Sequence, residues 1–179
     1  EEGQLTPDLS GNSNVGKLFT GNALDFNGST DSVDIDGFQL AGSDATFAFW
    51  INPDLTTGFR PIFDVNSTRL RFRISSGNLE VLSGSTVTFG SIASNQWQRV
   101  VIVINGTSAS CYVNGVQSGV TQTITTIDIS TATLARIAAN FTGVGTLDGK
   151  LSDFQIYNAV WGADDIAYDY AKPNHLVTD

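Results

Sequence analysis

The sequence is poor in the residues on which many enzymes and small stapled domains depend. Its 179 residues contain one histidine, one cysteine and no methionine. A Ser/His/Asp triad or a pair of metal-binding histidines needs a histidine at the chemistry, whereas His175 lies in the segment after Pro173. Cys111 has no partner for an internal disulfide, so we expect a buried apolar side chain. No apolar run reaches the length of about 18 residues that membrane insertion requires.

Positive charge is also scarce. Nine lysines and arginines oppose 18 acids, which gives a formal net charge of −9. This balance argues against nucleic acid or an anionic membrane as a partner, since both select basic surfaces. All of the acids except Glu1, Glu2 and Glu80 are aspartates. Aspartate favours turns and caps whereas glutamate favours helix interiors, so the composition predicts an all-β chain rich in turns.

The chain is instead rich in short apolar segments separated by turn residues. No linker divides it, and turn signals recur roughly every 8–12 residues, which is typical of a sandwich. We therefore expect a single domain over residues 1–179, of which 171–179 form a tail. Asn114-Gly115 predicts a tight hairpin, and Gly77-Asn78 predicts a second. One short helix is expected near the end, in "GADDIAYDYA", with Gly162 as its N-cap.

Two segments are apolar at consecutive positions and not only at alternate ones. Residues 45–52 and 98–104 follow this pattern, which indicates central strands covered on both faces. Trp50 and Trp97 are expected in the core, because large aromatic side chains dominate protein cores. Trp161 is expected to seal the helix onto the sandwich, with Ile166 and Tyr170 as the apolar face of that helix.

The stretch "TRLRFRIS" places a positive charge at every second position. Residues i, i+2 and i+4 of a strand share a face, so Arg69, Arg71 and Arg73 are expected to line one exposed face. The side chains between them are expected to point to the core: Leu70, Phe72 and Ile74. Arg60 lies just upstream and is expected to extend this arginine stripe.

Two interpretations of the arginine stripe stay open. Asp64 and Glu80 flank it in the sequence and would neutralise it within the protein. Alternatively, arginine forks bind carboxylate and sulfate groups, so the stripe would recognise an acidic glycan, with Phe59 or Tyr112 stacking on it. The predicted ligand-binding residues are then Arg60, Arg69, Arg71, Arg73 and Tyr112.

Several motifs, taken in order, resemble a known family. They are "GNALDFNGSTDSVDI", "ATFAFWINPD", "NQWQRVVIVINGTSASCYVNGVQSG" and "LDGKLSDFQIYNAVWGADDI", which together span most of the chain. The set resembles the laminin-G-like, concanavalin A-like lectin/glucanase domains of the pentraxin-like superfamily. This resemblance implies a two-layer antiparallel jelly-roll sandwich with one short C-terminal helix. Arg99 occupies a position where the family often has histidine, so the resemblance implies no catalytic role there.

The enzymes of this family need acids that the sequence does not offer. A retaining glycosidase uses two carboxylates about 5 Å apart. The jelly-roll glycosidases carry them in an E-x-D-x-(x)-E motif, whereas Glu80 is the one internal glutamate here. The related lyases use a His, Tyr and Arg set. We therefore expect the protein not to be an enzyme.

Calcium is the one cofactor that the sequence supports. Calcium prefers clustered carboxylate and carbonyl oxygens from loops, which "DFNGSTD" and "LDGKLSD" offer. Several members of the family hold a structural calcium through the aspartate that corresponds to Asp153, so Asn27, Asp31 and Asp153 are the candidate ligands. Alternatively, Asp31 and Asp153 only accept hydrogen bonds from the backbone of their loops.

These observations lead to a first and a second hypothesis of function. The first is a non-catalytic carbohydrate-binding or adhesion module of an extracellular or virion-surface protein, with acidic glycans as candidate ligands. The second is a structural or assembly domain, such as a phage decoration or tail-associated module, that contacts other subunits or domains of its parent protein. A glycan-active enzyme is a weaker alternative.

Overall fold

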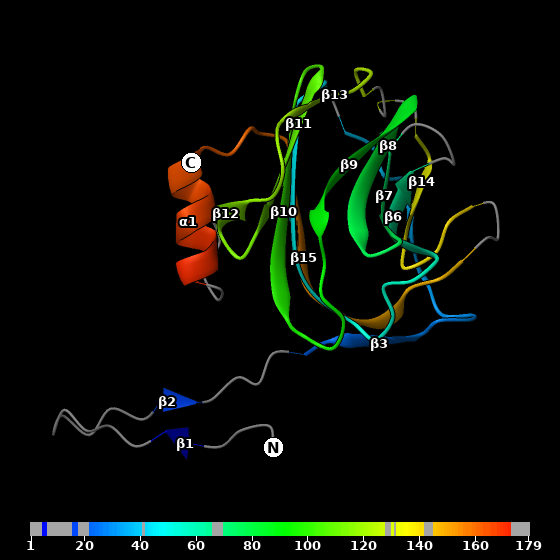
Figure 1. The fold of residues 1–179 in the computed structure, drawn as a ribbon, viewed down its shortest axis with the longest axis vertical. Helices are drawn as coiled ribbons and strands as arrows, with labels where there is room; N and C mark the ends of the chain where they lie inside the picture. Colours follow the sequence, from blue (N-terminus) through cyan, green and yellow to red (C-terminus); the bar gives the residue numbers. More distant parts are fainter. Residues whose placement is uncertain are drawn as a thin grey trace, which may run out of the picture.

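The computed structural model describes residues 5–6, 16–17, 22–40, 42–65, 70–127, 130, 132–141 and 145–172. Within these residues the strands form two large sheets that face each other, as Figure 1 shows. All strand pairs are antiparallel, which confirms the predicted sandwich. Arg69 and the tail after 172 lie outside the described residues, and so does His175.

The larger sheet has seven strands and the smaller has six. The seven-stranded sheet runs in the order β12 (Val116–Gln117), β11 (Ser108–Val113), β10 (Gln98–Asn105), β5 (Ala45–Pro53), β15 (Asp148–Tyr157) and β3 (Leu24–Asn27), with β13 (Gln122–Thr123) also on β11. The six-stranded sheet runs β4 (Val33–Asp36), β14 (Leu134–Ile137), β6 (Phe59–Val65), β7 (Leu70–Ser75), β8 (Asn78–Ser83) and β9 (Ser85–Ser91). β1 (Leu5–Thr6) and β2 (Gly16–Lys17) pair separately.

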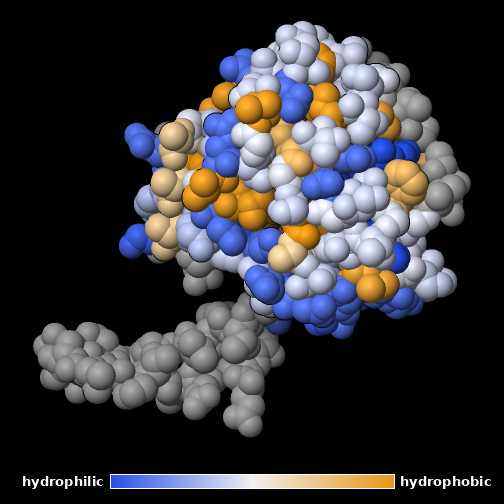
Figure 2. Space-filling view, viewed as in Figure 1, coloured by the Kyte–Doolittle hydropathy of each residue, from blue (hydrophilic) through white to orange (hydrophobic). Residues whose placement is uncertain are grey.

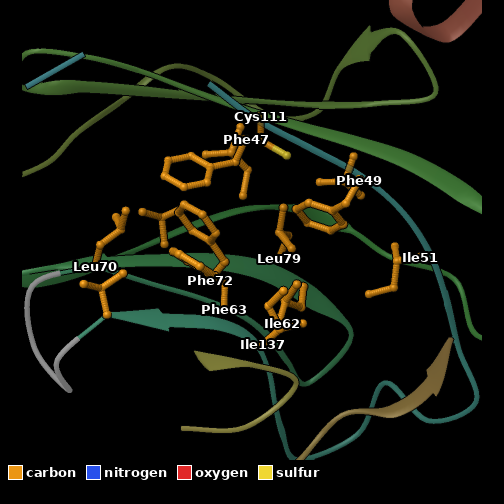
Figure 3. Packing of buried hydrophobic residues seen from close by; sticks show 14 of the residues in the cluster. Phe47, Phe49, Ile51, Ile62, Phe63, Leu70, Phe72, Leu79, Cys111 and Ile137 are labelled. Atoms are coloured by element: carbon orange, nitrogen blue, oxygen red, sulfur yellow. The ribbon is translucent and has the colours of Figure 1, made fainter. Parts of the chain in front are cut away.

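The core fills the space between the two sheets. Alternate side chains of each strand point inward, and Figure 3 shows phenylalanines of both sheets meeting between them. The rings of Phe47 on β5 and Phe72 on β7 meet edge to face, with centroids 4.7 Å apart. Cys111 lies in the same cluster and is fully buried, as the sequence predicted.

A second apolar cluster covers the opposite face of the seven-stranded sheet. Ala48 of β5 and Val101 and Val103 of β10 pack there against Trp161 and Ile166. Ile166 belongs to helix α1 (Ala163–Ala171), which lies along the outer side of this sheet in Figure 1. The prediction that the two central strands are covered on both faces is confirmed, and so is the role of Trp161.

Three expectations about the aromatic residues were wrong. Trp50 is half-buried and belongs to neither apolar cluster. Trp97 is 42% exposed, because it precedes the first residue of β10 and lies outside the core. Tyr170 is 41% exposed, and Asp169 is the second buried residue of the helix beside Ile166. The helix start is as predicted: the Gly162 N–H donates to Asp165 Oδ2 at 2.7 Å. Helix α1 lacks the length and apolar character needed to cross a membrane.

The turns follow from residues that tolerate positive φ. Asn114 and Gly115 have φ of 52° and 78°, which confirms the hairpin between β11 and β12. The β7–β8 turn lies one residue earlier than predicted, at Ser76 and Gly77, because Asn78 is already paired with Ser75. In the view of Figure 2, apolar surface gathers over β12 next to α1, where Val116 is 71% exposed.

Candidate functional site

The outer face of the six-stranded sheet carries alternating charges on adjacent strands. The pairing register places in one line, from β4 through β14 and β6 to β7, the residues Asp34, Arg136, Asp64 and Arg71. We call this line the charged row. Directly opposed unlike charges stabilise neighbouring strands, whereas like charges in the same places would separate them.

The outer end of the charged row is a two-point ion pair. Arg136 donates from Nε and Nη2 to the two carboxylate oxygens of Asp34, at 2.5 and 2.9 Å. These hydrogen bonds lower the pKa of Asp34 and raise the pKa of Arg136. The Arg136 guanidinium also lies 4.7 Å from the ring centroid of Phe141, which covers this part of the face.

The inner end of the charged row is buried. Arg71 Nη2 donates to Asp64 Oδ2 at 2.9 Å, and the two side chains are 9% and 0% exposed. The Phe141 N–H donates to the same oxygen at 3.1 Å. The expectation that Arg71 stands exposed was therefore wrong, because the adjacent strand supplies its counter-charge and the chain covers the pair. Leu70, Phe72 and Ile74 are buried as predicted.

Arg73 lies in a more open environment on the same face. Its Nε donates to Glu80 Oε2 at 2.6 Å, and its guanidinium carbon lies 4.6 Å from the ring centroid of Phe59. Phe59 is 49% exposed, whereas the Arg73 and Glu80 side chains are 17% and 14% exposed. We call Phe59, Arg73 and Glu80 the Arg73 cluster. Polar side chains border it on the same face: Ser75, Asn78 and Thr88.

The other two predicted ligand residues of the described chain lie elsewhere. Arg60 is opposite Ile74, whose side chain is in the core, so Arg60 does not share the face of Arg73. It donates to the carbonyl oxygens of Thr57 and Thr146, at 3.0 and 3.4 Å. Tyr112 belongs to the seven-stranded sheet, packed beside α1. The structure therefore brings Arg71 and Arg73 together and separates Arg60 and Tyr112 from them.

The loop that contains Asn27 and Asp31 satisfies its own hydrogen bonds. Asn27 Oδ1 accepts from the N–H groups of Ser29 and Thr30, both at 2.9 Å. Asp31 Oδ2 accepts from the Asn27 N–H at 3.2 Å. This arrangement is the backbone-capping alternative that the sequence left open. In the part of the chain that the structure describes, no three His, Cys, Asp or Glu side chains are grouped to hold a metal.

Asp153 lies far from that loop along β15. Asn27 is opposite Asp148, and five residues of strand, roughly 16 Å, separate Asp148 from Asp153. A bulge after Ser152, with φ of 50° at Asp153, turns the carboxylate outward. Its two oxygens accept from Arg99 Nη1 at 2.9 Å and from Gln155 Nε2 at 2.6 Å. The three predicted calcium ligands are thus not brought together.

Arg99 is the charged residue whose role the sequence reasoning missed. It is fully buried and donates from Nε and Nη2 to the two oxygens of Asp169, at 2.7 and 2.6 Å. Nη1 also donates to the backbone carbonyl of Asp153 at 3.1 Å. The guanidinium thus joins β10, β15 and α1. A charged residue three positions after Ile166, on the buried side of the helix, was the signal that could have revealed it.

Comparisons with known proteins agree with this architecture. A family model described as "Concanavalin A-like lectin/glucanases superfamily" matches residues 27–167. Among solved structures, a native heptameric SAP-like pentraxin from Limulus polyphemus has a TM-score of 0.65 at 18% identity, and the match covers 83% of this chain and 81% of that chain. A search of curated protein sequences found no significant match.

Receptor-binding domains of botulinum neurotoxins are also similar in fold. The type D domain has a TM-score of 0.64 at 19% identity, covering 87% of this chain but 45% of its own. The type D ligand-binding domain in complex with N-acetylneuraminic acid gives 0.64 at 21% identity, with 86% and 43% covered. This chain therefore spans less than half the length of those domains.

Proposed function

Because the chain belongs to the concanavalin A-like lectin/glucanase superfamily, we propose that it is a non-catalytic glycan-binding module. The family fold hosts several functions, so the proposal rests on a particular surface. That surface is the outer face of the six-stranded sheet around the Arg73 cluster, opposite the face that α1 covers (Figure 1).

The single observation that carries the proposal is the exposed ring of Phe59 beside the Arg73–Glu80 pair. A sugar ring presents an apolar C–H face and a rim of hydroxyls. Phe59 offers an apolar platform, while Arg73 and Glu80 are partly exposed donors and acceptors held in fixed positions. The toxin domain solved with N-acetylneuraminic acid supports a saccharide as the ligand class, although that sugar is itself acidic.

The charge pattern favours a neutral glycan over an acidic one. Arg71 and Arg73 each have a carboxylate partner on a neighbouring strand, and the chain carries a formal charge of −9. An anionic polysaccharide would have to displace Asp64 and Glu80 from the two arginines, and the negative charge of the protein would repel it. The acidic-glycan interpretation is therefore kept as one outcome of the test, in which binding is confined to uronate or sulfated sugars and weakens with salt.

The non-catalytic part of the proposal rests on Glu80. It is the one internal glutamate, and Arg73 holds its carboxylate as the acceptor of an ion pair. A glycosidase needs a protonated acid and a second carboxylate at a set distance. An extracellular or virion-surface setting remains part of this proposal.

The test is glycan binding measured on an array of neutral and acidic sugars and then by calorimetry for the best ligand. Phe59→Ala is expected to weaken binding about tenfold through loss of the stacking platform. Tyr168→Ala is the matched control, because Tyr168 is 46% exposed but lies on α1. The proposal fails if no sugar binds, or if Phe59→Ala and Tyr168→Ala have equal effects.

A further inference from the structure

The seven-stranded sheet exposes aromatic rings beside the C-terminal half of α1. Trp50 is opposite Arg99 in the β5–β10 pairing, and Trp97 immediately precedes β10, two residues before Arg99. The ring of Tyr170 lies with its centroid 6.2 Å from that of Trp50. We call Trp50, Trp97 and Tyr170 the aromatic strip. Trp97 and Tyr170 are 42% and 41% exposed.

The charged groups nearest the aromatic strip carry a small net negative charge, because Arg99 and the exposed Lys172, two residues after Tyr170, stand against Asp54, Asp153 and Asp169. Beneath it, Arg99 is bound by both Asp153 and Asp169, so one arginine against two aspartates leaves one net negative charge. At the Trp97 end, the Asn95 N–H donates to the Pro53 carbonyl at 2.7 Å, which brings the turn next to Asp54. Lys150, a cation on the same sheet, already lies 3.5 Å from the carboxylate of Asp25.

Arginine side chains of this protein lie against aromatic rings at several places. Arg73, Arg99 and Arg136 each place a guanidinium against an aromatic ring: Phe59, Trp50 and Phe141. Across the described residues, no lysine or arginine is placed in this way over Trp97 or Tyr170. Electron-rich ring faces within a negative field attract a cation from outside.

We propose that the aromatic strip docks a basic segment of a partner protein, whose arginine side chains stack on Trp97 and Tyr170. Tryptophan and tyrosine are the residues that most often dominate protein interfaces, and the field steers a cationic partner to them. A second copy of this chain is a poor source of cations, because five of the described lysines and arginines are already ion-paired. The aromatic strip lies on the sheet opposite the Arg73 cluster, so this inference stands independently of glycan binding.

The probe is the acetylated and amidated peptide Arg-Gly-Arg-Gly-Arg, with the same peptide carrying citrulline at each arginine as its neutral isostere. The chain has three tryptophans, so NMR spectra resolve three indole N–H signals. We expect the arginine peptide to shift the signals of Trp97 and Trp50 and to leave that of Trp161, which is 5% exposed, unchanged. The citrulline peptide is expected to bind at least fivefold more weakly.

Leucine substitutions separate ring stacking from general charge attraction. Trp97→Leu and Tyr170→Leu keep an apolar side chain and the net charge, and each is expected to weaken peptide binding about threefold, or about tenfold together. Tyr168→Leu is the control and is expected to have no effect. The backbone amide spectrum reports whether each variant is folded. If Trp97→Leu does not fold, Tyr170→Leu alone is enough to test the proposal. No binding, equal binding of the citrulline peptide, or unchanged binding in the leucine variants would each overturn the proposal.

Discussion

Asp169→Ala should be the most destabilising change of a single charged residue on α1. Asp169 is 1% exposed and accepts two hydrogen bonds from Arg99, which is itself fully buried. A hydrogen bond to a charged group contributes about 1.5–3 kcal/mol, and removing one partner of a buried ion pair typically costs about 3–5 kcal/mol. Because Arg99 keeps its contacts with Asp153, we expect the lower end, about 3 kcal/mol.

The assay is urea unfolding followed by tryptophan fluorescence, which yields both the midpoint and the m-value. Asp153→Asn is the internal comparison, because asparagine also tolerates the positive φ at this position: the Asp153 side chain is 33% exposed, and solvent screening should limit the cost to about 1 kcal/mol. The double variant Arg99→Leu with Asp169→Leu should recover part of the loss, since the charge it leaves unpaired, that of Asp153, is 33% exposed and not buried. Equal costs for the two single aspartate variants would refute the idea that the Arg99–Asp169 pair secures the helix.

Three further outcomes follow from the core and the charged groups. Phe72→Ala should cost about 3–5 kcal/mol in the same urea assay, because the fully buried ring leaves a cavity, and a loss below about 1 kcal/mol would contradict the packing. Burial raises the pKa of Cys111 from 9.0 to about 12, so the folded thiol stays neutral while the unfolded one ionises. Stability should therefore be unaffected by this thiol below about pH 9 and fall as pH rises towards 12, a decline that Cys111→Ala should lack. The pKa of Asp34 lies below 3.8 because of its hydrogen bonds from Arg136, so NMR titration should show it rise in Arg136→Gln. The contribution of that pair is present above the ordinary pKa and is lost as pH falls through the lowered one.

The architecture was predictable because it depends on patterns that extend over whole segments. Alternation of apolar residues placed Leu70, Phe72 and Ile74 in the core, and consecutive apolar residues marked β5 and β10 as covered on both faces. The Asn114-Gly115 turn needs positive φ at both positions, and Asn-Gly is a pair of residues that readily adopts it, so these two residues alone predict the turn. Errors appeared where a residue sits at the end of an element, as Trp97 does.

The site was less predictable because it depends on which strands become neighbours. The stripe of arginines was evident, but only the pairing of β6 with β7 sets Asp64 opposite Arg71. The contact of Arg99 with Asp169 joins residues 70 positions apart, and no periodicity reports such a distance. The bulge that turns Asp153 towards Arg99 could not be predicted from the alternation of apolar and polar residues, because a bulge interrupts that alternation.

The charged row also helps to fix which residues of neighbouring strands lie opposite each other, which apolar alternation alone does not determine. A strand that slips by one residue exposes its core side chains, but a slip of two keeps every apolar residue inside. Such a slip of β14 along β6 would place Leu134 or Ala138 opposite Asp64, and Arg136 would lose its position between two carboxylates. Asp64 is fully buried and would keep its ion pair with Arg71, but it would lose the second positive charge that Arg136 places opposite it. We infer that Arg71 and Arg136 help to specify strand register, whereas Phe59, which is 49% exposed, keeps the solvent access that the proposed glycan binding requires.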